Sequence, residues 1–272
     1  MERKREQGVP EMRGTRASAA GDGAPRITCP KCRRTSYNPN DISTGYCGHC
    51  HEFTGALKLV KPEMPEPPRF MRDLPVDPKR GYLVPWFVKW IDGQPEFRVM
   101  DRDKFWLAVK EKRCWVCGKS LYAEHVFTIG PMCAINRISS EPPSHRECAQ
   151  YSARVCPFLS KPQMTRRPIE TDEQIHVAGI MIERNPGVTL LYYTKRYRIL
   201  KVNDGVLFQL GRAFKVEWFR EGREATRAEV MESMRTGLPA LEKACDLDLD
   251  PAVAKEELKV QLKKALVLVP RQ

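Results

Sequence analysis

The sequence predicts an α+β fold assembled around paired cysteines, and three observations predict it. Cysteines recur as C-x-x-C pairs in the first half of the chain. Runs of β-branched and aromatic residues, separated by turns that contain glycine, follow later. Two helix-start signals then precede apolar residues at helical spacing near the C-terminus. The expected order is a tail, two metal-binding modules joined by a linker, a small antiparallel sheet and C-terminal helices.

Residues 1–26 are predicted to be a disordered tail. They contain Gly, Ala, Ser, Pro and mixed charge, with almost no large apolar side chain. Such a segment cannot bury enough apolar surface to offset the entropy that it loses on ordering.

Residues 27–59 contain two C-x-x-C pairs separated by fourteen residues. Each pair turns the backbone so that two thiolates face one point, and two pairs complete the closed tetrahedron of a structural zinc ion. Redox dithiols are the alternative, but no βαβ pattern of a redox fold surrounds the pairs. The predicted zinc ligands are Cys29, Cys32, Cys47 and Cys50. The block resembles a zinc ribbon, and zinc ribbons often serve nucleic-acid or protein partners.

Basic and aromatic side chains accompany these cysteines. We expect Lys31, Arg33 and Arg34 to contact nucleic acid, with Tyr37 and Tyr46 on the same face. The alternative for the two tyrosines is that they pack beneath the metal in a block with almost no core.

Residues 60–79 are predicted to be a stiff linker. The stretch 61–68 contains four prolines. Proline lacks a backbone N–H and biases the preceding residue toward extended geometry, which excludes a helix or an interior strand here.

Residues 80–167 are predicted to form a second zinc module, which begins with a β-hairpin. The apolar run 83–91 is followed by an Asp-Gly turn and by the extended run 96–100. Asp101 is expected to cap a helix that leads to the next C-x-x-C pair. After an extended segment at 126–129, the S-x-x-E capping box Ser144–Glu147 predicts a helix from His145 to about Cys156.

The ligands of this second module are predicted from their positions on that helix. His145 and Cys148 lie in its first turn and project side by side toward the C-x-x-C pair. Cys148 and Cys156 lie about 12 Å apart along the helix and cannot share an ion. Cys133 or Cys156 in place of His145 is an alternative, as is a set of buried thiols without metal. The predicted set is Cys114, Cys117, His145 and Cys148. A knuckle, a hairpin and two ligands from a helix start resemble a treble-clef zinc finger.

The hypothesis that the same module is an enzyme rests on two histidines and an asparagine. HNH nucleases also use treble-clef frames, with a histidine that activates water, an asparagine that orients it and a second histidine that holds a divalent ion. His125, Asn136 and His145 occur in that order. If His145 binds zinc, however, it cannot also hold a catalytic metal, so catalytic residues are not assigned and a non-enzymatic protein is favoured.

Residues 70–240 are similar to a set of uncharacterised proteins of bacteria and their phages. The similarity is carried by the stretches 127–137, 141–148 and 156–159. It implies a bacterial or phage origin, and it suggests nothing about mechanism because those proteins have no assigned activity.

Residues 168–247 are predicted to form a small antiparallel sheet followed by a helix. Extended runs occur at 188–193, 197–200, 206–210 and 214–219, with turns at 203–205 and 211–212. The capping box Thr226–Glu229 begins a helix that should end at Gly237-Leu238-Pro239. In residues 248–272, Asp250 and Pro251 supply a cap and a first-turn proline for a last helix.

A basic aromatic strand lies within this sheet. It combines two tyrosines with three cations and is suited to tracking a phosphate backbone. Charges on an exposed strand edge also prevent aggregation, which is the alternative. The residues are Tyr192, Tyr193, Lys195, Arg196 and Arg198.

The formal net charge of +12 favours a polyanionic partner, since each Lys or Arg placed on a phosphate releases a counterion. The leading expectation is therefore a zinc-binding, non-enzymatic nucleic-acid-binding protein. A protein-interaction adaptor that acts on a host factor and an HNH-like nuclease are the alternatives. The N-terminus leads into no apolar signal core, and no bilayer-length apolar stretch occurs. We expect a cytoplasmic protein with zinc as its cofactor, no small-molecule cofactor and no membrane partner.

Overall fold

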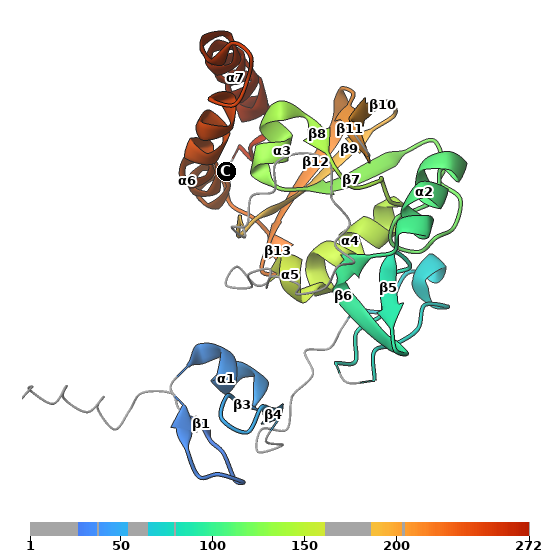
Figure 1. Cartoon of the computed structure of the whole chain (residues 1–272), viewed down its shortest axis with the longest axis vertical. Coiled ribbons are helices and arrows are strands. Elements are labelled where there is room, and N and C mark those ends of the chain that lie inside the picture. The colour runs from blue at the N-terminus through green and yellow to red at the C-terminus, as the bar shows by residue number, and fades with distance from the viewer. Residues whose placement is uncertain are drawn as a thin grey trace, which may run out of the picture. The chain divides into compact units, whose positions relative to one another are not determined.

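The computed structural model describes residues 27–36, 38–53, 65–78, 80–160, 186–202 and 205–271. The chain divides into two compact units, residues 1–64 and 65–272, and each is described by itself (Figure 1). The predicted tail, the first residues of the predicted linker and the segment 161–185 lie outside the described residues.

The first unit consists of two short hairpins and a helix. Strand β1 (Ile27–Thr28) pairs antiparallel with β2 (Thr35–Ser36), and β3 (Tyr46–Cys47) pairs antiparallel with β4 (Glu52–Phe53). Helix α1 (Pro39–Thr44) lies between the hairpins in the sequence. Ile27 is the only buried apolar side chain among the described residues of this unit apart from cysteines. Apolar packing therefore contributes little to holding the hairpins together.

The second unit begins within the range that the sequence assigns to the linker. A short 3-10 helix η1 (Arg69–Met71) buries Met71, which is 2% exposed, and Val76 bridges to Leu83. The predicted hairpin follows as β5 (Val88–Ile91) and β6 (Gln94–Met100). Its two turn residues, Asp92 and Gly93, both have positive φ, as a tight two-residue turn requires.

The strands of the second unit form two antiparallel sheets beyond that hairpin, where the sequence predicted one. The four-stranded sheet has the order β13-β12-β9-β7, and the three-stranded sheet has the order β10-β11-β8. The four strands of the first are β7 (His125–Ile129), β9 (Thr189–Thr194), β12 (Ala213–Arg220) and β13 (Arg223–Glu224). The three strands of the second are β8 (Ile138–Ser139), β10 (Tyr197–Val202) and β11 (Gly205–Leu210). The β8 segment has no alternating pattern long enough to predict it.

Helices cover both faces of the four-stranded sheet, and β9 shows why. Its side chains alternate between faces: Leu190 and Tyr192 join the large core with α3, α6 and α7, while Leu191 and Tyr193 pack with α4 (Figure 1). Both tyrosines are fully buried, so they are not part of an exposed basic strand. The helices are α2 (Arg102–Glu111), α3 (Pro131–Asn136), α4 (Arg146–Val155), α5 (Pro157–Ser160), α6 (Arg227–Cys245), α7 (Pro251–Ala265) and the 3-10 turn η2 (Leu266–Leu268).

Helix caps were predicted with mixed success. Asp101 caps α2, the Thr226–Glu229 capping box begins α6, and Asp250 caps α7, as expected. The capping box at Ser144 is wrong: the N-cap of α4 is His145, whose side chain makes no cap hydrogen bond. Ser144 is held in extended geometry instead, because its backbone exchanges two hydrogen bonds with Val126, of 2.8 and 3.1 Å.

The predicted end of α6 at Gly237-Leu238-Pro239 is also wrong, since the helix continues to Cys245. Gly237 is buried against Met132 of α3, whose terminal carbon lies 2.8 Å from where a Cβ at Gly237 would stand. The glycine thus permits close helix packing, and tertiary contacts override its low helix propensity.

The coarse prediction, an α+β chain with small antiparallel sheets and C-terminal helices, is confirmed. Trp218 of β12 fastens the last segment by donating a 2.8 Å hydrogen bond from its indole nitrogen to the carbonyl oxygen of Leu268. No helix in the described ranges is long and apolar enough to cross a bilayer.

Candidate metal centres

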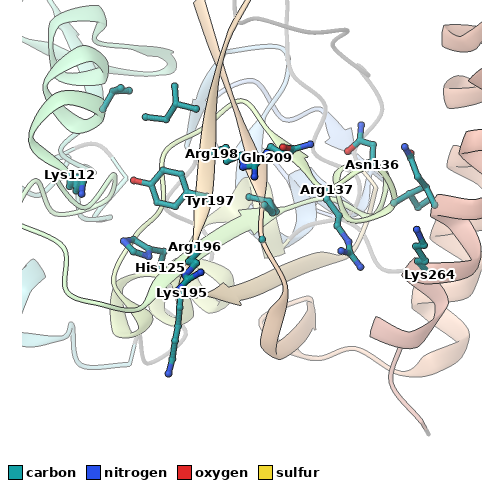
Figure 2. A pocket seen from close by; sticks show the side chains of 16 residues that line it. Lys112, His125, Asn136, Arg137, Lys195, Arg196, Tyr197, Arg198, Gln209 and Lys264 are labelled. Carbon is teal, nitrogen blue, oxygen red and sulfur yellow. The ribbon is translucent and has the colours of Figure 1, made fainter.

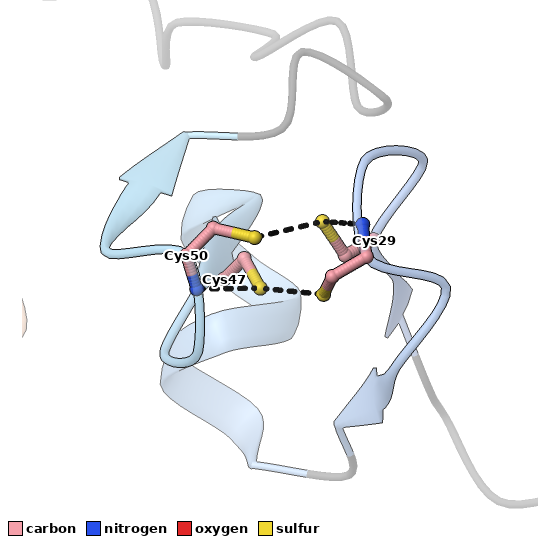
Figure 3. Close-up of side chains that lie close together, drawn as sticks. Cys29, Cys47 and Cys50 are labelled. Atoms are coloured by element: carbon pink, nitrogen blue, oxygen red, sulfur yellow. Dashed lines mark hydrogen bonds between the residues drawn. The ribbon is translucent and has the colours of Figure 1, made fainter.

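Two groups of four Cys or His side chains bring their donor atoms to within 4.8 Å of one another. The first group lies in the first unit and contains Cys29, Cys32, Cys47 and Cys50 (Figure 3). The second lies in the second unit and contains Cys114, Cys117, His145 and Cys148. These are the two ligand sets expected from the sequence.

Each C-x-x-C pair forms the same backbone turn. The residue after the second cysteine has positive φ, and its N–H donates a 2.8 Å hydrogen bond to the carbonyl oxygen of the first cysteine. Arg33, His51 and Gly118 occupy this position in the three pairs. At Gly118 a side chain is also excluded by contact, because a Cβ would lie 2.6 Å from the ring of Trp86.

Sulfur spacing in the first centre fits a tetrahedral zinc ion. Zn–S bonds of about 2.3 Å place sulfur ligands about 3.8 Å apart. The Sγ atoms of Cys29 and Cys50 are 3.9 Å apart, and those of Cys32 and Cys47 are 3.6 Å apart (Figure 3).

Electrostatics in the first centre favours a cation. The backbone N–H of Cys50 donates to Sγ of Cys47 at 3.4 Å and lowers the pKa of Cys47 to about 7. The sulfur of Cys32, followed by burial, raises the pKa of Cys50 to about 12. One thiolate therefore forms readily, but a full set at one point requires a positive charge between the sulfurs.

The second centre combines three sulfurs with one nitrogen. A zinc ion with Zn–S bonds of about 2.3 Å and a Zn–N bond of about 2.0–2.1 Å places these atoms about 3.6 Å apart. Nδ1 of His145 lies 3.4 Å from Sγ of Cys117 and 3.9 Å from Sγ of Cys148. The distances bracket the expected value.

The ring of His145 is oriented as a metal ligand. Its Nε2 lies 2.9 Å from the carbonyl oxygen of Ser120, so Nε2 carries the proton and donates it. Nδ1 is then free to direct its lone pair toward the sulfurs. Burial opposes protonation of this ring, but hydrogen bonds with Cys114 and Cys117 raise the pKa of His145 to about 10. In a metal-bound state the ion takes the place of that proton on Nδ1.

Apolar and aromatic groups enclose the second centre. Phe70 stacks on the ring of His145 with centroids 4.8 Å apart, and Tyr122 lies beside it at 5.2 Å. Met71 and Tyr151 are buried against the cysteines. All four ligand residues of this centre are buried, whereas Cys32 and Cys50 of the first centre are partly exposed.

Sequence reasoning missed the groups that orient and cover this centre. Ser120 acts through its backbone carbonyl, so residue type gives no signal. Phe70 and Met71 follow a proline-rich stretch whose composition indicates a linker. An isolated Arg-Phe-Met sequence has no periodicity that predicts burial.

The alternative ligands Cys133 and Cys156 belong to no metal-donor group in the described part of the chain. Cys133 lies in α3 and packs against the large core, where burial raises its pKa to about 11. Cys156 follows α4, and burial raises its pKa as well. Both are partly buried thiols.

The three residues of the HNH pattern are not assembled at one place. His145 is a member of the second centre. His125 at the start of β7 and Asn136 at the end of α3 line a separate cavity. No Asp or Glu is among the described residues that line that cavity.

The basic residues predicted for the first unit differ in their surroundings. Lys31 forms a 2.8 Å ion pair with Glu52 on the opposite hairpin, which neutralises its charge. Arg33 and Arg34 are exposed, and neither forms an ion pair with another described residue. Tyr46 packs edge-on against Phe53 with centroids 5.3 Å apart, while Tyr37 lies outside the described residues.

No protein family, curated protein or solved structure matches this chain. The resemblance to uncharacterised bacterial and phage proteins therefore stays a prediction.

Proposed function

We propose that this chain is a zinc-binding protein in which both metal ions are structural and the folded surface binds nucleic acid without catalysing a reaction. The observation that carries the metal assignment is the spacing of the donor atoms in the two groups of four. Sulfur-rich, four-coordinate sets suit zinc and poorly suit magnesium or calcium, which take oxygen ligands. With four protein donors each, neither ion retains an open position for a substrate.

The fold around each ion supports a finer assignment within this proposal. Two hairpins that each supply one C-x-x-C turn support the assignment of residues 27–53 as a zinc ribbon. A C-x-x-C turn brought together with His145 and Cys148 at the start of α4 supports the assignment of the second centre as a treble-clef zinc finger.

The nucleic-acid partner is supported by charge. The sequence carries 46 Lys and Arg against 34 Asp and Glu. In the first unit Arg33 and Arg34 are exposed next to the metal-binding turn and remain available to phosphates.

Titration of labelled single-stranded and duplex oligonucleotides at increasing salt tests the proposal on the zinc-loaded full chain. We expect binding that weakens steeply, with log K falling by about 0.7 to 0.9 per phosphate contact for each tenfold rise in salt. Binding that is absent, or that is insensitive to salt, contradicts it. Divalent-dependent cleavage of the oligonucleotide would show a nuclease instead, and capture of a host protein that survives nuclease treatment would show an adaptor.

A further inference from the structure

A cavity of about 850 Å³ lies in the second unit, and no residue of either metal-donor group lines it. Its walls come from the end of α2, the ends of β7 and α3 that carry His125 and Asn136, the turn between β9 and β10, the adjoining strands β10 and β11, and α7 (Figure 2). The volume lies within the range of about 300–1,000 Å³ that is usual for sites that enclose a small organic ligand. It is therefore large enough for a nucleotide.

The described lining of this cavity carries only positive charge. No carboxylate is among the described lining residues, and none of the lining cations forms an ion pair with a residue in the described ranges. Elsewhere in the unit such pairs are common, as between Arg146 and Glu124 or Arg223 and Glu229. The six cations are Lys112, Arg137, Lys195, Arg196, Arg198 and Lys264. Concave walls of low dielectric concentrate this unpaired charge and attract an anion.

Protection of a strand edge does not explain this arrangement. The edge strand β10 of the three-stranded sheet contributes Arg198 alone. The other cations lie at the C-caps of α2 and α3, in the β9–β10 turn and in α7. Figure 2 shows Lys112 and Lys264 at opposite sides of the view with Arg137 between them. Charges on separate elements that surround one hollow indicate a shared ligand.

The backbone at the β9–β10 turn is fixed in advance. The hydroxyl of Thr194 lies 2.9 and 3.1 Å from the carbonyl oxygens of Arg196 and Arg212, which share its single hydrogen. The N–H of Gly211 also donates to the Arg196 carbonyl at 3.0 Å, and a Cβ at Gly211 would lie 2.4 Å from that oxygen. Lys195 and Arg196 are thus presented from a rigid turn, which lowers the entropy lost when they bind a ligand.

Apolar and neutral polar groups complete the cavity. Tyr197 and Ile199 provide apolar surface beside the cations, and Ile199 is 43% exposed. His125 packs edge-on against Tyr197, with centroids 5.0 Å apart. Its Nδ1 is buried without a hydrogen-bond partner in the described part of the chain, and burial, together with Lys112, lowers its pKa.

We propose that this cavity binds a nucleotide unit of a single-stranded polynucleotide, with its phosphates on the surrounding cations and its base against Tyr197 and Ile199. The inference rests on the proposed nucleic-acid function and names its site. A single strand is specified because the cations line a hollow, whereas the phosphates of a duplex lie on a convex cylinder.

A matched pair of double variants tests the site. Arg198→Gln/Lys264→Gln removes two lining cations, and Lys201→Gln/Lys263→Gln removes two cations from the same strand and the same helix that do not line the cavity. All four side chains are exposed and none forms an ion pair with a described residue, so neither pair of substitutions should disturb the fold. Thermal melts of both variants verify this. Binding of labelled oligothymidylate, oligouridylate and a duplex to the zinc-loaded full chain is then measured across a salt series.

We expect the cavity variant to bind both single strands about tenfold or more weakly, since each lost charge-assisted contact is large. Each lost phosphate contact contributes about 0.7 to the slope of log K against log salt, so the loss of two contacts should reduce the size of that slope by about 1.4. The affinity of the control variant should stay within about threefold of the wild-type affinity. Tighter binding of oligothymidylate or of oligouridylate identifies DNA or RNA as the ligand. Equal weakening in both variants, or a duplex that binds as tightly as the single strands, overturns this site while the proposed function stands. A wild type that binds no polynucleotide overturns both.

Discussion

Gly118→Ala should weaken the second metal centre more than its small size suggests. Gly118 has a φ of +73° and closes the Cys114–Cys117 turn through its N–H. A Cβ there meets three atoms of the Trp86 ring at 2.6–2.7 Å, closer than real contacts allow. Either the indole or the turn must move, and the turn carries two of the four metal ligands.

The expected loss of stability in Gly118→Ala has two parts. Left-handed geometry costs a residue with a Cβ about 1–2 kcal/mol. Overpacking of a well-filled site adds about 1–3 kcal/mol. The sum of about 2–5 kcal/mol corresponds to a fall in Tm of about 4–20 °C for a unit of this size.

Gly93→Ala is the matched control. Gly93 has almost the same φ, +71°, but a Cβ there meets nothing within 4 Å. It bears only the backbone cost of about 1–2 kcal/mol, and it lies in a hairpin turn outside either metal-donor group.

Calorimetric melts of zinc-loaded protein, with and without a competing chelator, separate the two variants. We expect Gly118→Ala to melt at a lower temperature than Gly93→Ala and to release one zinc ion at a lower chelator concentration. If both variants melt together and hold zinc equally, Trp86 does not brace the turn and the reasoning is refuted.

Three other outcomes are expected. The Arg223 guanidinium holds the pKa of Glu229 at about 2, below its usual range. The ionised Glu229 carboxylate therefore stabilises the fold above the ordinary pKa of a glutamate, and this stabilisation is lost as pH falls toward 2. Glu229→Gln should therefore lower the free energy of unfolding by about 1 kcal/mol at neutral pH. The difference in unfolding free energy between wild type and variant, measured by urea titration, should disappear in acid. A difference that stays constant with pH would contradict this. Chelation should expose residues 27–53 to trypsin before residues 65–160, because a single side chain, Ile27, supplies almost all of the apolar burial within residues 27–53. Simultaneous cleavage of the two ranges would argue against a metal-dependent first unit. His145→Cys should retain the second zinc ion in native mass spectra and His145→Ala should release it at lower chelator concentration, whereas equal retention would remove His145 as a ligand.

The metal ligands could be predicted because their information is local. A C-x-x-C pair specifies its own turn, and His145 and Cys148 share the first turn of one helix, so spacing alone brings them together. The β5–β6 hairpin and the caps at Thr226 and Asp250 were predictable for the same reason.

What the sequence could not predict depends on contacts between distant segments. The helix α6 continues through Gly237 because Met132, over a hundred positions earlier, packs against it. Ser144 was misread as a cap because its partner, Val126, lies in another strand. The cations of the cavity are scattered from Lys112 to Lys264, so no local pattern marks them as one site.

Zinc counting by native mass spectrometry of the reduced full chain tests the central claim most directly. The wild type should carry two zinc ions, while Cys47→Ser and Cys117→Ser should each carry one, because each removes a ligand from a different centre. A folded wild type that carries no zinc, or two single variants that both keep the full complement, would contradict the account.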